Sequence, residues 1–136
     1  MTSVPSGPPV PGLRVEHRRY VPYSAAHYAG NLVDGAWGLG LFGDVATELC
    51  IRTDGDEGLF AAYTDVQFRA PVHAGDTVVA SATLTRVGTR SRRMDFELVV
   101  VTRGNPASGS SAAVLSDPVV ATTATGIVVV PVRLDQ

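Results

Sequence analysis

The sequence contains no lysine: all 11 of its basic residues are arginines. A Schiff-base mechanism is therefore excluded, because it needs a lysine amine as the nucleophile. Cysteine is nearly absent too, since Cys50 is the only one in the chain. A single cysteine can form no disulfide within the chain and supplies too few ligands for a cysteine metal site. Cys50 stands between Leu49 and Ile51, so we expect a core residue in a reducing compartment.

Strong charge and long apolar runs are also missing. The net charge is -2, so the chain lacks the basic excess of a nucleic-acid-binding protein. No stretch approaches the roughly 20 apolar residues that span a membrane. The start of the chain has no apolar segment of the kind found in signal peptides. We therefore expect a cytoplasmic protein without nucleic-acid or membrane partners.

Length and composition fit one globular domain. The chain has 136 residues, of which 45% are hydrophobic and 18% are charged. Residues 1–13 hold four of the nine prolines and are predicted to be a flexible lead-in. Residues 14–136 are then the single domain.

A helical pattern of apolar residues begins at Leu32 and runs to Cys50. The apolar stripe is too wide for a surface helix and indicates a central one. Asn31 and Asp34 are both candidates for its N-cap. Each glycine inside the helix costs about 1 kcal/mol relative to alanine, so we expect its backbone to approach a sheet or a ligand closely. These glycines are Gly35, Gly38, Gly40 and Gly43.

Five segments have the composition and alternation of β-strands. Short turns at 74–76 and 87–89 indicate antiparallel neighbours. A sheet that curls around one helix buries both, which predicts an α+β domain of the hotdog type; the alternative is a flat sheet with the helix lying on it. The predicted strands are 14–23, 59–69, 77–87, 90–103 and 119–130, with loops at 24–31 and 104–117.

Several motifs together carry a family resemblance. The most specific are His-Tyr-x-Gly-Asn at 27–31 and Gly-Asp-x-x-Thr-Glu at 43–48. The others lie at 54–60, 70–76 and 123–126, so the motifs span most of the folded chain. The chain resembles the hotdog-fold ammonia lyases that act on 3-aminobutyryl-CoA and β-alanyl-CoA. It is also similar to enzymes of natural-product pathways that add glycine to a carrier-bound 2-enoyl chain, a step that release of the acid can follow.

The resemblance implies an enzyme that adds an amine to the β-carbon of a 2-enoyl thioester, or removes it. The amine is ammonia or glycine, and the thioester is carried by CoA or by an acyl carrier protein. No cofactor is expected beyond the CoA or phosphopantetheine of the substrate itself. A homodimer or a dimer-based hexamer is expected, with sites built by both chains.

This reaction passes through an enolate, so the site needs a donor for the thioester oxygen. The free backbone N–H groups at a helix start are suited to this role. Gly35, Ala36 and Trp37 are the candidates, and oxyanion donors of this kind contribute about 3–4 kcal/mol each. The alternative is that Gly35 serves only close packing.

The site also needs a group that moves the α-proton. Asp44 and Glu48 are spaced i, i+4 and share one helix face, so two carboxylates would repel and one pKa would rise. That pattern provides an acid and a base at neutral pH. Related thioesterases have a base or nucleophile near the place of Asp44, and Glu48 resembles the residue typical of the lyases. Alternatively, one carboxylate pairs with Arg69 or with a partner chain.

The loop before the helix supplies the remaining candidates. His27 could hold the thioester, orient a carboxylate or carry a proton, or it could simply fix the loop. Tyr28 and Asn31 are either substrate donors or loop scaffolding. We expect His17 and His73 to be structural, and no metal site is predicted.

Two other functions remain open at this stage. A simple thioesterase would use the helix carboxylate to activate water at the carbonyl carbon. A non-catalytic acyl-binding protein would use the same cavity without chemistry. A reaction that depends on an added amine would distinguish the amine-adding enzyme from both of these alternatives.

Overall fold

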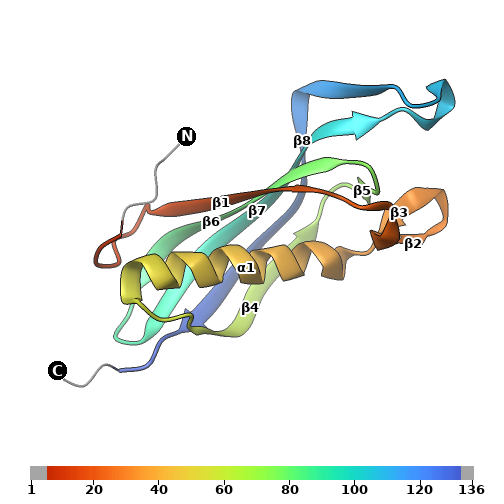
Figure 1. Ribbon diagram of the computed structural model, residues 1–136. Coiled ribbons are helices and arrows are strands. Elements are labelled where there is room, and N and C mark those ends of the chain that lie inside the picture. The colour runs from red at the N-terminus through yellow and green to blue at the C-terminus, as the bar shows by residue number, and fades with distance from the viewer. Residues whose placement is uncertain (1–5, 133–136) are drawn as a thin grey trace.

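A curved antiparallel sheet is the largest element of the protein, whose computed structural model describes residues 6–132 (Figure 1). Within these residues the strand order across the sheet is β1-β6-β7-β8-β4. A short turn joins β6 to β7 and makes these consecutive strands neighbours. The turn at 74–76 does not do the same for β4 and β6, because β8 is the partner of β4. The strands are β1 (Arg14–Tyr20), β4 (Leu59–Phe68), β6 (Thr77–Val87), β7 (Ser91–Gly104) and β8 (Ala112–Val129).

The alternation of buried and exposed side chains along β7 shows which face of the sheet is the inner one. Met94, Phe96 and Leu98 are buried, whereas Arg93 and Asp95 are exposed. Successive side chains of a strand point to opposite faces, so this pattern gives the sheet one apolar face and one polar face. The alternation predicted from the sequence is confirmed.

Helix α1 (Gly35–Asp54) lies along the inner face of the sheet (Figure 1). The start at Leu32 that an Asn31 N-cap would give is wrong, because residues 32–33 form strand β3 (Leu32–Val33), whose backbone pairs with β5 (Val72–His73). Of the two candidate N-caps, Asp34 holds the position. The helix ends at Gly55, which adopts a left-handed conformation with φ 64° that glycine tolerates.

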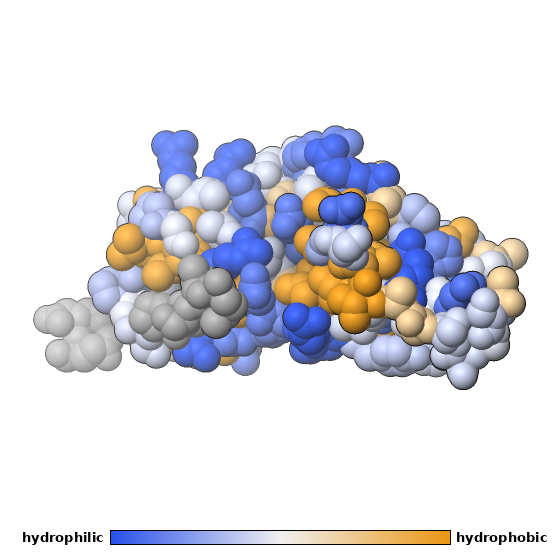
Figure 2. Space-filling view, turned by 90° about the horizontal axis from the view of Figure 1, so that it is seen from above, coloured by the Kyte–Doolittle hydropathy of each residue, from blue (hydrophilic) through white to orange (hydrophobic). Residues whose placement is uncertain are grey.

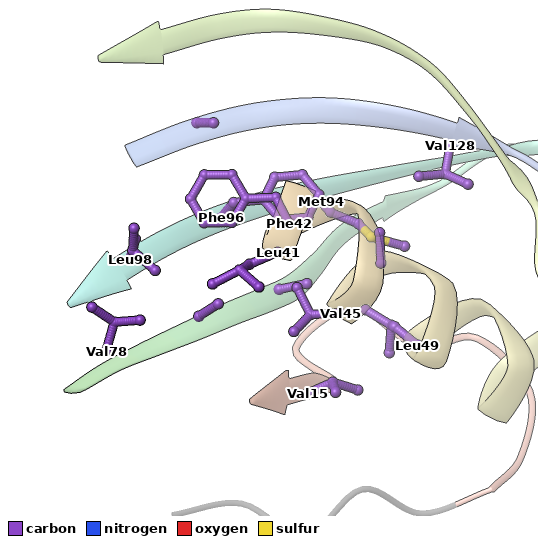
Figure 3. Close-up of a cluster of buried hydrophobic side chains, with 14 of the residues drawn as sticks. Val15, Leu41, Phe42, Val45, Leu49, Val78, Met94, Phe96, Leu98 and Val128 are labelled. Atoms are coloured by element: carbon purple, nitrogen blue, oxygen red, sulfur yellow. The ribbon is translucent and has the colours of Figure 1, made fainter. Parts of the chain in front are cut away.

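The core lies between α1 and the inner face of the sheet. Phe42 and Phe96 stack with ring centroids 5.1 Å apart, and Val45 and Leu49 continue the buried helix face (Figure 3). Full burial of such a side chain contributes about 2 kcal/mol. Cys50 is also fully buried, as predicted, and burial raises the pKa of its thiol to about 11.

The segment predicted as a loop before the helix is held by short regular elements. Strand β2 (Ala26–Tyr28) pairs with β3, and two 3-10 helices flank it, η1 (Tyr23–Ala25) and η2 (Ala29–Asn31). Asn31 has a positive φ of 60°, and its carbonyl accepts a hydrogen bond from the amide of Ala74 at 2.9 Å. The loop is therefore fixed against the start of α1.

Strand β8 begins earlier than the sequence predicts. Residues 112–117 were expected in a loop, yet their backbone continues the pairing with β7, as at Arg103 and Ala113. Only the tip of this hairpin is irregular, with a 3-10 helix η3 (Pro106–Ser108). Small side chains carry little strand preference of their own, and pairing with an existing neighbour overrides it.

A curved sheet wrapped around one long helix is the hotdog arrangement, so the predicted α+β class is confirmed and the flat-sheet alternative is wrong. The predicted lead-in, 1–13, lies partly outside the described residues. In its described part, the amide of Gly7 donates to the carbonyl of Arg52, and that of Gly12 to the carbonyl of Leu84. In residues 6–132, no helix combines the length and apolarity needed to cross a membrane.

Candidate active site

A cavity of about 560 Å³ opens at the start of α1. It lies between the first turn of the helix, the end of β4 and the segment that leads into β5. Its wall is mainly apolar, with few polar groups, as is usual for small-molecule sites. The lining residues are Tyr28, Val33, Asp34, Gly35, Ala36, Trp37, Gly38, Phe68, Arg69, Ala70, Pro71, Val72, Leu98 and Thr122.

The helix start offers backbone donors to this cavity. Within residues 6–132, no hydrogen-bond acceptor faces the amides of Gly35 and Ala36. The expectation that Trp37 also offers a free amide is wrong, because its N–H donates to the carbonyl of Asp34 at 3.2 Å. Two donors at the positive end of the helix dipole suit an oxygen that gains negative charge.

Gly35 also has a packing role. A Cβ built at this position would lie 2.4 Å from Cε1 of Phe68, which is closer than any real contact. The absence of a side chain therefore lets the Phe68 ring close the cavity wall. Gly35 can therefore serve both roles, because the Phe68 ring that packs against it and its own backbone N–H both belong to the wall of this cavity.

The loop residues divide into two groups. Tyr28 lines the cavity, as expected for a substrate-binding residue. His27 and Asn31 are exposed and do not line it. The imidazole of His27 instead meets the ring of Tyr28 edge-on, with centroids 4.6 Å apart. A contribution of His27 through Tyr28 stays a prediction.

The two helix carboxylates lie away from this cavity within one subunit. Asp44 is exposed, and neither Asp44 nor Glu48 belongs to the cavity wall. Glu48 stands thirteen positions after Gly35, which corresponds to roughly 20 Å along the helix axis. The donors at the helix start and Glu48 of the same subunit cannot therefore act on one thioester group.

Glu48 is held by a hydrogen bond on each oxygen. Its Oε1 lies 2.6 Å from Nε2 of His17 on β1, and its Oε2 accepts from Nε of Arg52 at 2.8 Å. The bond from His17, followed by that from Arg52, keeps the pKa of Glu48 below its ordinary value. The expectation of a raised pKa is wrong for this residue, because two donors outweigh the effect of partial burial.

His17 is the polar residue whose setting the sequence did not reveal. An ionised carboxylate can only accept, so Nε2 of His17 carries the proton of its hydrogen bond to Glu48. On the other side of the ring, Nδ1 lies 3.5 Å from Nη2 of Arg19. Alternation placed His17 on a face of β1, but no local pattern told which helix residue would lie opposite.

No group of three His, Cys, Asp or Glu side chains suited to a metal ion occurs in the described part of the chain. Two ion pairs with buried members hold the fold together. Asp76 is fully buried and accepts from Arg103 at 2.9 Å, and Arg92 bonds both oxygens of Asp54. The first of these pairs anchors the segment before β6, whose residues Pro71 and Val72 line the cavity.

The fold and the cavity at the helix start define the class as a hotdog domain. The family model of the Thioesterase superfamily matches residues 32–107, and the chain belongs to this family. The chain is 53% identical, over 108 residues, to the 3-aminobutyryl-CoA ammonia lyase of Acetoanaerobium sticklandii. This match covers 78% of the chain and 85% of that protein, so the resemblance seen in the motifs is confirmed.

Two solved structures show the same architecture. The β-alanyl-CoA:ammonia lyase of Clostridium propionicum matches with a TM-score of 0.83 and 37% identity, covering 89% of this chain and 87% of that one. A hexameric thioesterase of Yersinia pestis matches with a TM-score of 0.69 and 18% identity, covering 85% and 84%. At that lower identity the second likeness concerns the fold alone.

Proposed function

We propose that this protein is an enzyme that adds an amine to the β-carbon of a 2-enoyl thioester, or removes it. The observation that carries the proposal is the 53% identity to a protein named 3-aminobutyryl-CoA ammonia lyase, over 78% of this chain. The cavity at the start of α1 supports the proposal. It is large enough for a small molecule, and the free amides of Gly35 and Ala36 lie in its wall.

In the direction of addition, the lone pair of the amine forms a bond to the β-carbon. The π-electrons of the double bond move toward the carbonyl oxygen, which becomes an enolate oxyanion. The amides of Gly35 and Ala36 would hold that oxygen, and such preorganised donors are typically the largest single contribution to catalysis. A carboxylate base, for which Glu48 is the candidate, would take one proton from the cationic nitrogen of the adduct and deliver it to the α-carbon, so that the amine adds across the double bond. Elimination follows the same steps in reverse.

A second copy of the chain would complete the site. One face of α1 is uncovered: Ala36, Gly40 and Asp44 are exposed, and an added Cβ at Gly40 or Gly43 meets nothing within 4 Å. Small residues let another helix approach closely on such a face. A homodimer, or a hexamer built from dimers, would bring Asp44 and Glu48 of one subunit toward the cavity of the other.

The thioester carrier would enter between the subunits. Arg69 lies at the cavity wall, where its guanidinium could meet a phosphate of CoA or of a phosphopantetheine arm. CoA or an acyl carrier protein thus serves as part of the substrate, and no separate cofactor is proposed. We propose the cytoplasm as its location, because both carriers are found there.

The second candidate function is a thioesterase of the same family. The match to the family model of the Thioesterase superfamily favours it. In that reaction a carboxylate activates water, which attacks the carbonyl carbon and releases the thiol. The two reactions share the oxyanion donors and differ in the atom that is attacked.

The test is incubation of the protein with crotonyl-CoA and either ammonia or glycine. Amine addition predicts a product heavier by the mass of the amine, without release of thiol.

In the same assay, Glu48→Gln should lower turnover by at least about 100-fold, the range of general acid–base catalysis. The matched control is Glu57→Gln, which changes an exposed glutamate next to the helix end. Wild-type turnover in Glu48→Gln would remove Glu48 from the mechanism, and amine-independent thiol release would favour the thioesterase.

A further inference from the structure

We propose that Asp34 recognises the amine: its carboxylate binds the nitrogen that becomes positively charged as it bonds to the β-carbon, or the ammonium group that is removed in the reverse reaction. This inference rests on the amine-adding function proposed above, and it names the group that would select a cationic amine. Asp34 immediately precedes the two free amides in the sequence, and it lines the same cavity.

The carboxylate of Asp34 has no protein partner in the described residues. Asp34 occupies the N-cap of α1, yet its side chain accepts no hydrogen bond from the helix amides. Arg69 lines the same cavity, but no ion pair joins the two, and Nε of Arg69 donates to Thr123 at 2.9 Å. Asp34 is half-buried and is the only acidic residue that residues 6–132 contribute to the cavity wall.

The carboxylate of Asp34 leaves its acceptor positions open to a ligand. Aspartate at an N-cap commonly accepts a hydrogen bond from the second or third helix amide, which stabilises the helix by about 1 kcal/mol. In this protein that bond is not made, so the carboxylate oxygens can accept from a group bound in the cavity. A carboxylate is negatively charged and only accepts hydrogen bonds, so it favours a cationic ligand.

The charges of the reaction match this arrangement. When the amine bonds to the β-carbon, its nitrogen becomes positive while the carbonyl oxygen becomes negative. These two atoms are separated by only a few bonds in the adduct, and Asp34 directly precedes Gly35 and Ala36 in the cavity wall. The amides would stabilise the oxygen, and the carboxylate would stabilise the nitrogen. For elimination, the same carboxylate would bind the ammonium group of the substrate.

The experiment measures how Asp34→Asn changes the Michaelis constants of the full-length protein for each substrate. Asparagine and serine cap helices about as well as aspartate, so Asp34→Asn and Asp34→Ser should both fold. Loss of one hydrogen bond to a charged group predicts that KM for ammonium chloride, or for glycine, rises about 10- to 100-fold. KM for crotonyl-CoA should change little, because the amides remain.

Asp117→Asn, which removes an exposed carboxylate of β8, is the matched control and should leave both constants unchanged. An unchanged amine KM in folded Asp34→Asn and Asp34→Ser would overturn this inference while the proposed function stands. If the wild-type protein forms no amine adduct with either amine, the proposed function fails, and the role of Asp34 fails with it.

Discussion

At the scale of single residues, the two carboxylates to which we assign roles in the proposed reaction have opposite settings. Glu48 is held by His17 and Arg52, so it stays ionised at neutral pH and would begin a catalytic cycle as a proton acceptor. Asp34 has no partner in the described chain and faces the cavity. We therefore assign proton transfer to the first and charge recognition to the second, as roles to be tested.

The pKa of Glu48 predicts how stability depends on pH. A carboxylate whose pKa is lower in the folded state stabilises the protein above its ordinary value of 4.5, and this contribution is lost as pH falls through the folded value. Wild type should therefore resist urea better than Glu48→Gln at pH 7, and the difference should shrink below pH 4.5. Exposed Glu57 is the matched control, and Glu57→Gln should match wild type throughout. A difference that stays constant as the pH falls below 4.5 would contradict this account of the His17–Glu48 pair.

The sequence predicted part of the cavity wall and missed the rest. Tyr28 and the first turn of the helix were expected there, because a helix start and its preceding loop are local features. Asp34 was considered only as a cap, since no local pattern shows whether an N-cap side chain is satisfied. The pairing of His17 with Glu48 joins residues 31 positions apart, which depends on how β1 crosses the helix.

At the scale of elements, helix α1 has one face against the sheet and one face left open. The buried face includes Leu41, Phe42 and Leu49, whereas Gly40 and Asp44 face outward. An amphipathic surface helix normally places large polar residues on its outer face. Small residues there are better explained by contact with another helix, which we propose comes from a second copy.

Gly40→Leu tests this face. In one subunit an added side chain at Gly40 meets open space, so the fold should be kept and helix propensity should improve. If the face is a subunit contact, the side chain would separate the subunits and lower activity. Sedimentation velocity compares the variant with Gly104→Leu, whose added side chain also meets open space on β7. An unchanged sedimentation coefficient for Gly40→Leu would place the subunit contact elsewhere.

Most elements could be predicted from periodicity, because apolar spacing differs between strand and helix over long segments. β6 (Thr77–Val87) has the predicted bounds, and β7 differs by one residue at each end. The first strand ends at Tyr20 rather than at residue 23, and three segments pair as strands where none was predicted: 26–28, 32–33 and 112–117. The last two are short or small-residue segments that pair with strands distant in sequence. Local propensity carries no information about such partners.

At the scale of the whole molecule, one subunit presents half of the proposed site. The donors and Asp34 are at one end of α1, and Glu48 is toward the other.

Edge strand β4 is paired on one side only within the described sheet and ends in Phe68, which is 60% exposed. Seen from above, the surface is largely polar but carries an apolar patch near its middle (Figure 2). Patches of this kind mark contact surfaces in soluble proteins, which is consistent with assembly of several copies.

The central claim is that the amine attacks the β-carbon while the α-carbon gains a proton. Incubation with crotonyl-CoA and the amine in D2O, followed by mass spectrometry after return to H2O, measures both events together. The account predicts an adduct that carries one non-exchangeable deuterium at the α-carbon for each amine added. Free thiol formed at the same rate with and without amine, and no deuterium at the α-carbon, would contradict it.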